Sequence, residues 1–185
     1  MRLFWFSISL FCAALLLASH FVLEKYLFMQ PCEQCVYIRF AISVIAIGAF
    51  VATFKIFFSS FFGYILSGFG IVYGIISALK LNSIYKSIKE LNSFGITPCK
   101  MEPDFVFGLK LQQFDFFRPK ADCGFDMPVV PLNANLSPLQ SFFIDLYKDG
   151  WYLIPNLKFI NLAEACIAIF IALSAILVFR IWRML

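Results

Sequence analysis

Long runs of apolar residues dominate the chain, and four of them are long enough to cross a membrane. A bilayer core takes about 20 apolar residues as a helix. The four runs cover residues 3–23, 36–58, 61–81 and 159–181. The pattern predicts an all-α integral membrane protein, a bundle of four transmembrane helices that forms a single membrane domain over residues 1–185. Within the third run, Gly70 and Gly74 have the spacing that lets membrane helices approach closely.

The two connections on one side of this bundle differ in length, residues 24–35 and residues 82–158. The longer loop is predicted to be mostly irregular because prolines interrupt it at Pro98, Pro103, Pro119, Pro128 and Pro131.

One stretch of the long loop carries helix signals. Ser137 suits an N-cap, Pro138 the first helical position and Gln140 a capping box, and Gly150 can close the helix. Apolar residues recur between them at helical spacing. This short helix either lies on the outer leaflet or packs on the rest of the loop.

Residues that flank the apolar runs indicate the nature of the first run and the orientation of the bundle in the membrane. Arg2 precedes the run, as in a secretory signal, but the run is longer than a signal core and no clear cleavage site follows, which favours a membrane anchor. Basic residues without acidic ones mark one side as cytoplasmic. These residues are Arg2, Lys55, Arg180 and Arg183. Both termini are therefore expected in the cytoplasm, and residues 24–35 and 82–158 on the opposite side.

Composition supports this interpretation and excludes others. Hydrophobic residues make up 62% of the chain and charged residues 14%, and the mean hydropathy is +0.86, values that a soluble fold does not tolerate. The net charge of +4 is modest, and the phenylalanines lie in apolar runs rather than between basic residues. Nucleic-acid binding therefore has little support.

The six cysteines fall into two classes. Cys12 and Cys166 lie inside the first and fourth runs, where a thiol acts as a small apolar side chain. The other four lie on the outer side, where cellular reductants do not keep thiols reduced. They are Cys32, Cys35, Cys99 and Cys123, and their number suggests two disulfides.

The first outer pair lies in the opening turn of the second predicted membrane helix. Free backbone N–H groups and the helix dipole favour a thiolate there. Arg39 follows Cys35 by one helical turn, and a cation within a span costs about 2–3 kcal/mol unless it is compensated. It can hold a Cys35 thiolate, polarise a carbonyl of a lipid-soluble oxidant, or do both.

Several simpler interpretations remain open. A Cys-x-x-Cys pair also builds zinc sites, but zinc needs further ligands that the motif does not supply, so no metal is predicted. Arg39 can instead reach the headgroups or pair with Glu164. His20, the single histidine, either lines the same site or packs in the bundle. Cys99 and Cys123 can also form a purely structural disulfide, which stabilises a loop by about 3 kcal/mol.

The order of these residues resembles the DsbB family of membrane thiol oxidases, and its DsbI branch in particular. The shared features are Pro31-Cys32-x-x-Cys35 before the second span, Arg39 four residues later, and a second cysteine pair in the loop before the last span. The strings PCEQCVYIRFA and GWYL add to the likeness with DsbI. Two features depart from DsbB itself: Ile38 stands where an acidic residue is common, and the second outer loop is longer.

The resemblance implies a cellular location and an electron relay. The protein would lie in a bacterial inner membrane with periplasmic loops. A reduced thioredoxin-fold oxidase, DsbA-like or DsbL-like, would attack a Cys99–Cys123 disulfide at Cys99. Cys123 would then attack Cys32, and Cys35 beside Arg39 would pass electrons to ubiquinone or menaquinone. The mobile loop expected from its composition suits such a relay.

Two other classes compete with this interpretation. Proteins like vitamin K epoxide reductase also couple outer cysteines to quinone, but they usually carry the Cys-x-x-Cys motif in a late span. A non-enzymatic membrane protein with two structural disulfides would have the same cysteine count.

Overall fold

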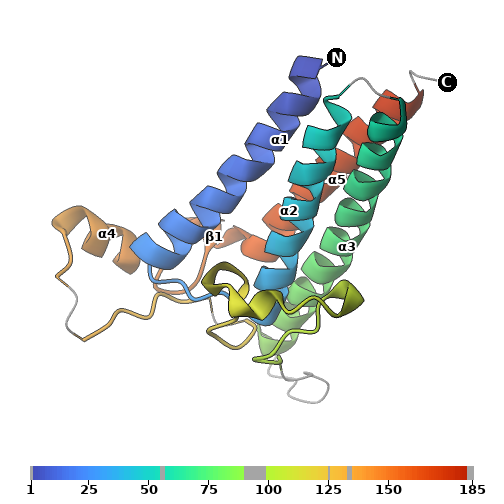
Figure 1. Cartoon of the computed structure of the whole chain (residues 1–185). Coiled ribbons are helices and arrows are strands. Elements are labelled where there is room, and N and C mark those ends of the chain that lie inside the picture. Colours follow the sequence, from blue (N-terminus) through green and yellow to red (C-terminus); the bar gives the residue numbers. More distant parts are fainter. Residues whose placement is uncertain (1, 55–56, 90–98, 125, 133–134, 183–185) are drawn as a thin grey trace.

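Four long helices form the body of the molecule in the computed structural model, which describes residues 2–54, 57–89, 99–124, 126–132 and 135–182 (Figure 1). All four are long and apolar enough to cross a membrane, which confirms the predicted all-α membrane bundle. Their bounds are α1 Arg2–Leu17 with a π-helical continuation Ala18–Tyr26, α2 Glu33–Ala52, α3 Phe57–Lys89 and α5 Leu162–Trp182.

Helix α2 is the central helix. Half of its most apolar stretch is buried, against 6% of the corresponding stretch of α1. It packs against both α1 and α3, and α5 packs against α3. The residues at the start of α2 are therefore surrounded by other elements, whereas α1 is open to lipid along most of its length.

The N-terminal end of α1 and the C-terminal end of α5 lie together. The Arg180 guanidinium carbon is 3.9 Å from the centre of the Phe4 ring, and Figure 1 shows the two chain ends at the same end of the bundle. The loops between α1 and α2 and between α3 and α5 occupy the opposite end. Of the basic residues used to predict the orientation, Lys55 and Arg183 lie outside the described residues.

Helix α5 begins three residues after the start of the fourth apolar run. Phe159–Asn161 form strand β2, which pairs antiparallel with β1 (Tyr152–Ile154). Asn161 then caps α5: its Oδ1 accepts a hydrogen bond from the Glu164 N–H at 2.8 Å, and Glu164 Oε2 accepts one from the Asn161 N–H at 3.1 Å. This reciprocal cap fixes the start of the helix and occupies Glu164.

The long loop contains the predicted short helix, α4 (Pro138–Leu146). Ser137 caps it, accepting a hydrogen bond from the Gln140 N–H at 3.2 Å. The Gln140 side chain, however, donates to the Tyr26 carbonyl at 2.8 Å instead of completing a capping box. The helix ends at Leu146, and Gly150, with a φ of +105°, closes the turn that follows it.

Glycines bring α3 close to its neighbours. A Cβ on Gly70 would lie 2.8 Å from Ile45 Cγ1 and 2.9 Å from the Ala41 carbonyl of α2. A Cβ on Gly74 would meet the Phe170 ring of α5. The two glycines therefore face two different helices, in agreement with the predicted role of their spacing.

Gly70→Ala is expected to lower stability by about 1–3 kcal/mol, because the methyl group overlaps atoms that cannot move without shifting α2. The thermal midpoint of the detergent-solubilised protein measures this effect. Gly68→Ala is the matched control, since its Cβ would have Leu177 Cδ2 as its nearest neighbour at 3.8 Å. Equal midpoints for the two variants would contradict the close approach.

Candidate active site

The four outer cysteines form two disulfides, Cys32–Cys35 and Cys99–Cys123, with Cα–Cα distances of 5.0 Å and 5.9 Å. Cys12 and Cys166 carry free thiols. The pairing agrees with the two disulfides that the cysteine positions predicted.

The Cys32–Cys35 disulfide caps the start of α2. Cys32 has an extended backbone and is the N-cap, and its Sγ accepts a hydrogen bond from the Cys35 N–H at 3.2 Å. The N-terminus of a helix presents free N–H groups and positive potential. It therefore stabilises negative charge that develops on Cys32 when the disulfide opens.

The two disulfides lie side by side. The N–H groups of Lys120 and Ala121 donate to the Pro31 carbonyl at 2.8 Å and 3.3 Å, which joins the segment before Cys123 to the residue before Cys32. The Lys100 N–H donates to Glu33 Oε2 at 2.7 Å, which joins the residue after Cys99 to the residue after Cys32. Both disulfides are therefore fastened to the same turn of chain.

Exposure differs within each pair. Cys32 and Cys123 are buried, with 4% and 6% of their surface exposed, whereas Cys35 and Cys99 are half-buried. An external thiolate therefore reaches the second disulfide most easily at Cys99, and an external electron acceptor reaches the first most easily at Cys35.

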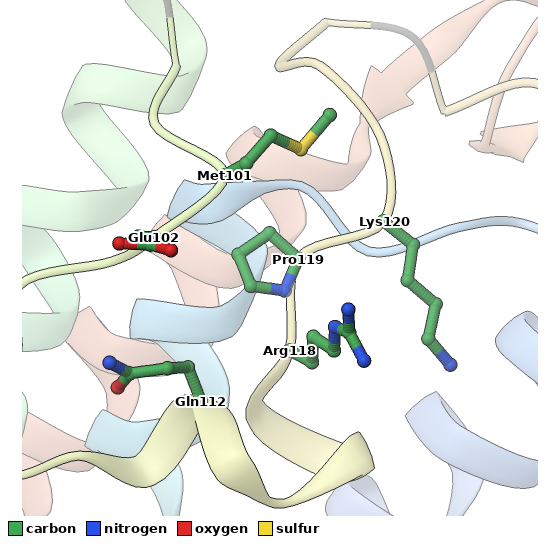
Figure 2. A pocket seen from close by; sticks show the side chains of 6 residues that line it. All are labelled: Met101, Glu102, Gln112, Arg118, Pro119 and Lys120. Atoms are coloured by element: carbon green, nitrogen blue, oxygen red, sulfur yellow. The ribbon is translucent and has the colours of Figure 1, made fainter.

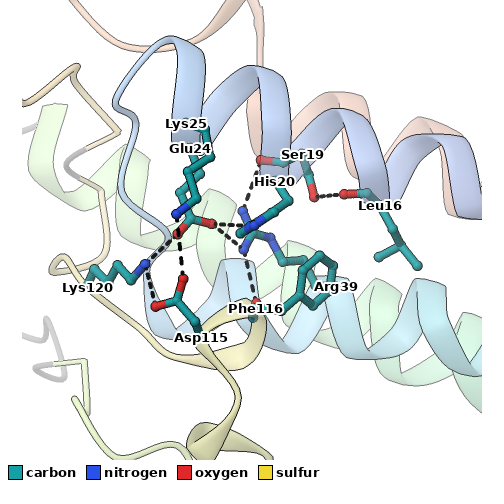
Figure 3. Close-up of polar contacts among 9 residues, drawn as sticks. All are labelled: Leu16, Ser19, His20, Glu24, Lys25, Arg39, Asp115, Phe116 and Lys120. Atoms are coloured by element: carbon teal, nitrogen blue, oxygen red, sulfur yellow. Dashed lines mark hydrogen bonds and ion pairs between the residues drawn. The ribbon is translucent and has the colours of Figure 1, made fainter.

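Arg39 lies one helical turn after Cys35, and its buried guanidinium is held by the π-helical continuation of α1 and by the long loop (Figure 3). Its Nη1 pairs with Glu24 Oε2 at 2.9 Å and donates to the Phe116 carbonyl at 3.1 Å. Its Nη2 donates to the Ser19 carbonyl at 3.1 Å. The alternative pairing with Glu164 is wrong, because Glu164 caps α5. The action of Arg39 on a Cys35 thiolate stays a prediction.

The Glu24 carboxylate is the centre of a cluster of charged side chains. Besides Arg39, its carboxylate binds Lys120 Nζ at 2.6 Å and His20 Nδ1 at 3.0 Å, as Figure 3 shows. Lys120 also pairs with Asp115 at 2.8 Å. Burial alone would lower the pKa of Lys120, but its bonds to Asp115 and Glu24 raise that pKa above the ordinary value. The ion pairs join α1, α2 and the loop that carries Cys123.

Glu24 and Lys120 are members of this cluster that the sequence did not reveal. Glu24 follows the first apolar run directly, and it stands four residues after His20, a spacing that places both on one helical face. His20 and Glu24 lie in the π-helical continuation of α1 (Ala18–Tyr26). This conformation is rare in proteins and is frequently found at functional sites. His20 was a candidate for this site, and its ring reaches the same carboxylate as Arg39.

A quinone fits the donors that these residues offer. Its carbonyl oxygens accept hydrogen bonds, and a guanidinium has five N–H groups in a fixed plane. In the described part of the chain, the hydrogen bonds of Arg39 go to Glu24, Phe116 and Ser19 and use three of these groups. The remaining two N–H groups have no hydrogen-bond partner among the described residues.

A cavity of about 570 Å³ separates the two arms of the long loop. Met101 and Glu102 line it from the arm that follows Cys99, and Arg118, Pro119 and Lys120 line it from the arm that precedes Cys123, as seen in Figure 2. Gln112 completes the wall.

Asp126 fastens the segment after Cys123. Its carboxylate accepts hydrogen bonds from the Trp151 N–H at 3.0 Å and from the Tyr85 hydroxyl. Burial raises the pKa of Asp126 above its ordinary value, although both hydrogen bonds act in the opposite direction. The folded protein therefore holds this proton more tightly than the unfolded chain.

Stability is expected to fall as the pH rises through the raised pKa of Asp126. The contribution of this group is complete below the ordinary aspartate pKa of about 3.9 and is lost above its folded value. Thermal midpoints across a pH series measure the trend, and Asp126→Asn should flatten it. Asp122→Asn, at an exposed position, is the control. A wild-type curve that Asp126→Asn leaves unchanged would exclude this role.

Comparison with known proteins gives a consistent result. The family described as "Disulfide bond formation protein DsbB" matches residues 1–180. A DsbI protein of Campylobacter fetus is 40% identical over 98% of this chain and 86% of its own length. The protein-disulfide oxidoreductases DsbI of Escherichia coli and Salmonella typhimurium are 38% and 37% identical over 91% of this chain, and 80% and 79% of their own lengths. No solved structure matches.

Proposed function

The chain belongs to the DsbB family of disulfide bond formation proteins, and from this premise we propose that it reoxidises a periplasmic thioredoxin-fold dithiol oxidase and passes the electrons to a membrane quinone. The partner is DsbA-like or DsbL-like. One membrane domain, residues 1–185, lies in the bacterial inner membrane with both termini in the cytoplasm and the two outer loops in the periplasm.

The observation that carries this proposal is the adjacent pair of disulfides with unequal exposure. A relay needs one sulfur that a soluble protein can reach and one that a lipid-soluble acceptor can reach. Cys99 and Cys35 are the more exposed members of their pairs, Cys123 and Cys32 are buried, and all four cysteines belong to one packed cluster. Two purely structural disulfides have no need of this arrangement.

The relay proceeds by four thiol–disulfide exchanges. A thiolate of the reduced partner attacks Cys99 Sγ, which breaks the Cys99–Cys123 bond and leaves Cys123 as a thiolate. The second partner thiolate attacks the mixed disulfide, so the partner leaves oxidised with Cys99 reduced. Cys123 attacks Cys32 Sγ, and Cys35 leaves as a thiolate. Cys99 then attacks Cys123, which restores the outer disulfide and returns Cys32 as a thiolate.

The Cys32–Cys35 dithiol must then lose two electrons and two protons as its disulfide reforms. Quinone, when bound, supplies the two-electron acceptor. Arg39 and His20 are the residues that would hold it, and Arg39 also lowers the energy of a Cys35 thiolate by its positive charge. A partner of the DsbA kind has a reduction potential of about −120 mV, so its reoxidation needs a strong oxidant. Glutathione couples are too reducing for this role.

Reconstitution tests this function. Detergent-purified protein is mixed with a reduced thioredoxin-fold oxidase and a soluble quinone, and quinol formation is followed optically. We expect one quinol for each partner disulfide formed. Quinol that forms without partner oxidation, or an outer disulfide that stays closed while the partner is present in excess, would refute the proposal.

A further inference from the structure

The arm of the loop that follows Cys99 is fastened to α2 by two side chains. Glu33 Oε2 accepts the Lys100 N–H at 2.7 Å. The Tyr37 hydroxyl accepts the Asp104 N–H at 2.9 Å, and it lies 3.1 Å from Glu33 Oε1 and 3.3 Å from the Asp104 carbonyl, to either of which it can donate. Glu33 and Tyr37 stand one turn apart on α2, so they form a single attachment, which we call the α2 latch.

An aromatic side chain completes the attachment. Phe105 is buried against the apolar face of α2 that Val36, Phe40 and Val44 form. Its ring centre lies 5.6 Å from that of Tyr37 and 5.5 Å from that of Phe40, in edge-to-face contacts. The chain from Lys100 to Phe105 is therefore held at both ends.

The arm that carries Cys123 has separate attachments. Backbone groups of Lys120 and Ala121 bind the Pro31 carbonyl, and the Lys120 side chain pairs with the buried Glu24 carboxylate. Further along, the Val129 N–H donates to the Phe28 carbonyl at 3.0 Å. These contacts use neither Glu33 nor Tyr37. Loss of the α2 latch therefore frees Cys99 while Cys123 stays in place.

We propose that Glu33 and Tyr37 are positioning residues that set the redox potential and the accessibility of the Cys99–Cys123 disulfide by holding Cys99 beside Cys123. This inference rests on the proposed function for its biological meaning but not for its physical basis. When the disulfide is open, the latch keeps the two thiols close, which raises their effective concentration. A higher effective concentration favours the disulfide and makes it harder to reduce.

The latch thereby adjusts the outer disulfide to its place in the relay. A loosely held Cys99 would give a disulfide that any small thiol opens, since exchange depends on access to the attacked sulfur. A latched Cys99 is half-buried and yields to a partner that binds the loop. Glu33 lies inside the Cys32-x-x-Cys35 motif itself, so the same turn of chain that carries one disulfide controls the other.

The test measures the outer disulfide alone, in full-length protein with Cys32→Ser and Cys35→Ser. Its equilibrium with a dithiothreitol redox buffer is compared with and without Tyr37→Phe, which removes the hydroxyl and keeps the ring. We expect the equilibrium to shift about tenfold toward the dithiol, which is about 30 mV for a two-electron couple. Glu33→Ala should give a shift of the same sign.

Controls separate the latch from general loosening. Lys100→Ala removes only the exposed ion pair with Asp104 and keeps the backbone N–H that binds Glu33, so no shift is expected. In protein with Cys35→Ala and Cys99→Ala, the rate at which added oxidised dithiothreitol cross-links Cys32 to Cys123 as a disulfide should be unchanged by Tyr37→Phe.

The outcomes are decisive in either direction. An equilibrium constant within twofold of the parent for both Tyr37→Phe and Glu33→Ala overturns the inference, and so does a cross-linking rate that falls with the potential shift. Neither measurement uses partner or quinone. A failure of the proposed function would instead appear as wild-type protein that forms no quinol.

Discussion

Cys99→Ala is expected to reduce partner-driven quinol formation to the uncatalysed rate. Cys99 is the half-buried sulfur of the outer pair, and the sulfurs beyond it, Cys123 and Cys32, are almost fully covered. Exchange requires direct approach to a disulfide sulfur. Without Cys99 the outer pair offers no such sulfur, and Cys35, the other half-buried sulfur, lies in the membrane helix α2. The measurement is quinol formation with reduced thioredoxin-fold oxidase as the electron donor.

Two companion variants identify the cause of the loss. Cys12→Ala should keep the full rate, since Cys12 carries a free thiol inside the bundle, away from the outer disulfides. A partner whose second cysteine is replaced by alanine should accumulate a mixed disulfide with Cys99, visible on a non-reducing gel, because the thiolate that would resolve this disulfide is missing. Normal turnover by Cys99→Ala would show that electrons enter at another sulfur.

Local sequence signals predicted the bundle and the positions of the cysteines. The four apolar runs, the cap at Ser137 and the placement of Cys32 at a helix start each depend on residues that are close in sequence, so periodicity and capping rules detect them. The start of α5 was less accurate, because β2 takes its first residues through pairing with β1.

Contacts between distant residues were beyond such rules. Glu24 meets Arg39 across 15 positions and Lys120 across 96, and a pattern of apolar and polar positions does not reveal which charges meet. The first apolar run ends at Leu23, so Glu24 counted as a loop residue instead of a member of the buried cluster. The α2 latch was missed for the same reason, since Glu33 and Lys100 are 67 positions apart.

The Arg39 cluster also alters the expected role of the guanidinium. The sequence suggested that this cation holds a Cys35 thiolate, polarises a carbonyl of a lipid-soluble oxidant, or does both, whereas in the structure Glu24 supplies its opposite charge. A buried ion pair of this kind is costly to break and holds its members in fixed positions. Arg39 is therefore held in a fixed orientation by residues other than the cysteines.

Arg39→Ala is accordingly expected to impair the quinone half of the relay and to spare the thiol half. A hydrogen bond to a charged group contributes about 1.5–3 kcal/mol, and 1.4 kcal/mol is a factor of ten. Quinol formation should therefore fall about 10- to 100-fold through a higher KM for quinone, a lower kcat, or both. Mixed-disulfide formation at Cys99, measured with a reduced partner whose second cysteine is replaced by alanine, should keep its rate.

The matched control is Arg180→Ala, which removes a guanidinium at the opposite end of the bundle, where it stacks on Phe4. Glu24 keeps His20 and Lys120 as partners in the Arg39 variant, so its carboxylate remains compensated, and a thermal midpoint checks that the bundle is intact. Unchanged KM and kcat for quinone would remove Arg39 from the acceptor site. An equal loss of quinol formation and of mixed-disulfide formation would mean that the ion pair of Arg39 with Glu24 instead positions the loop that carries Cys123.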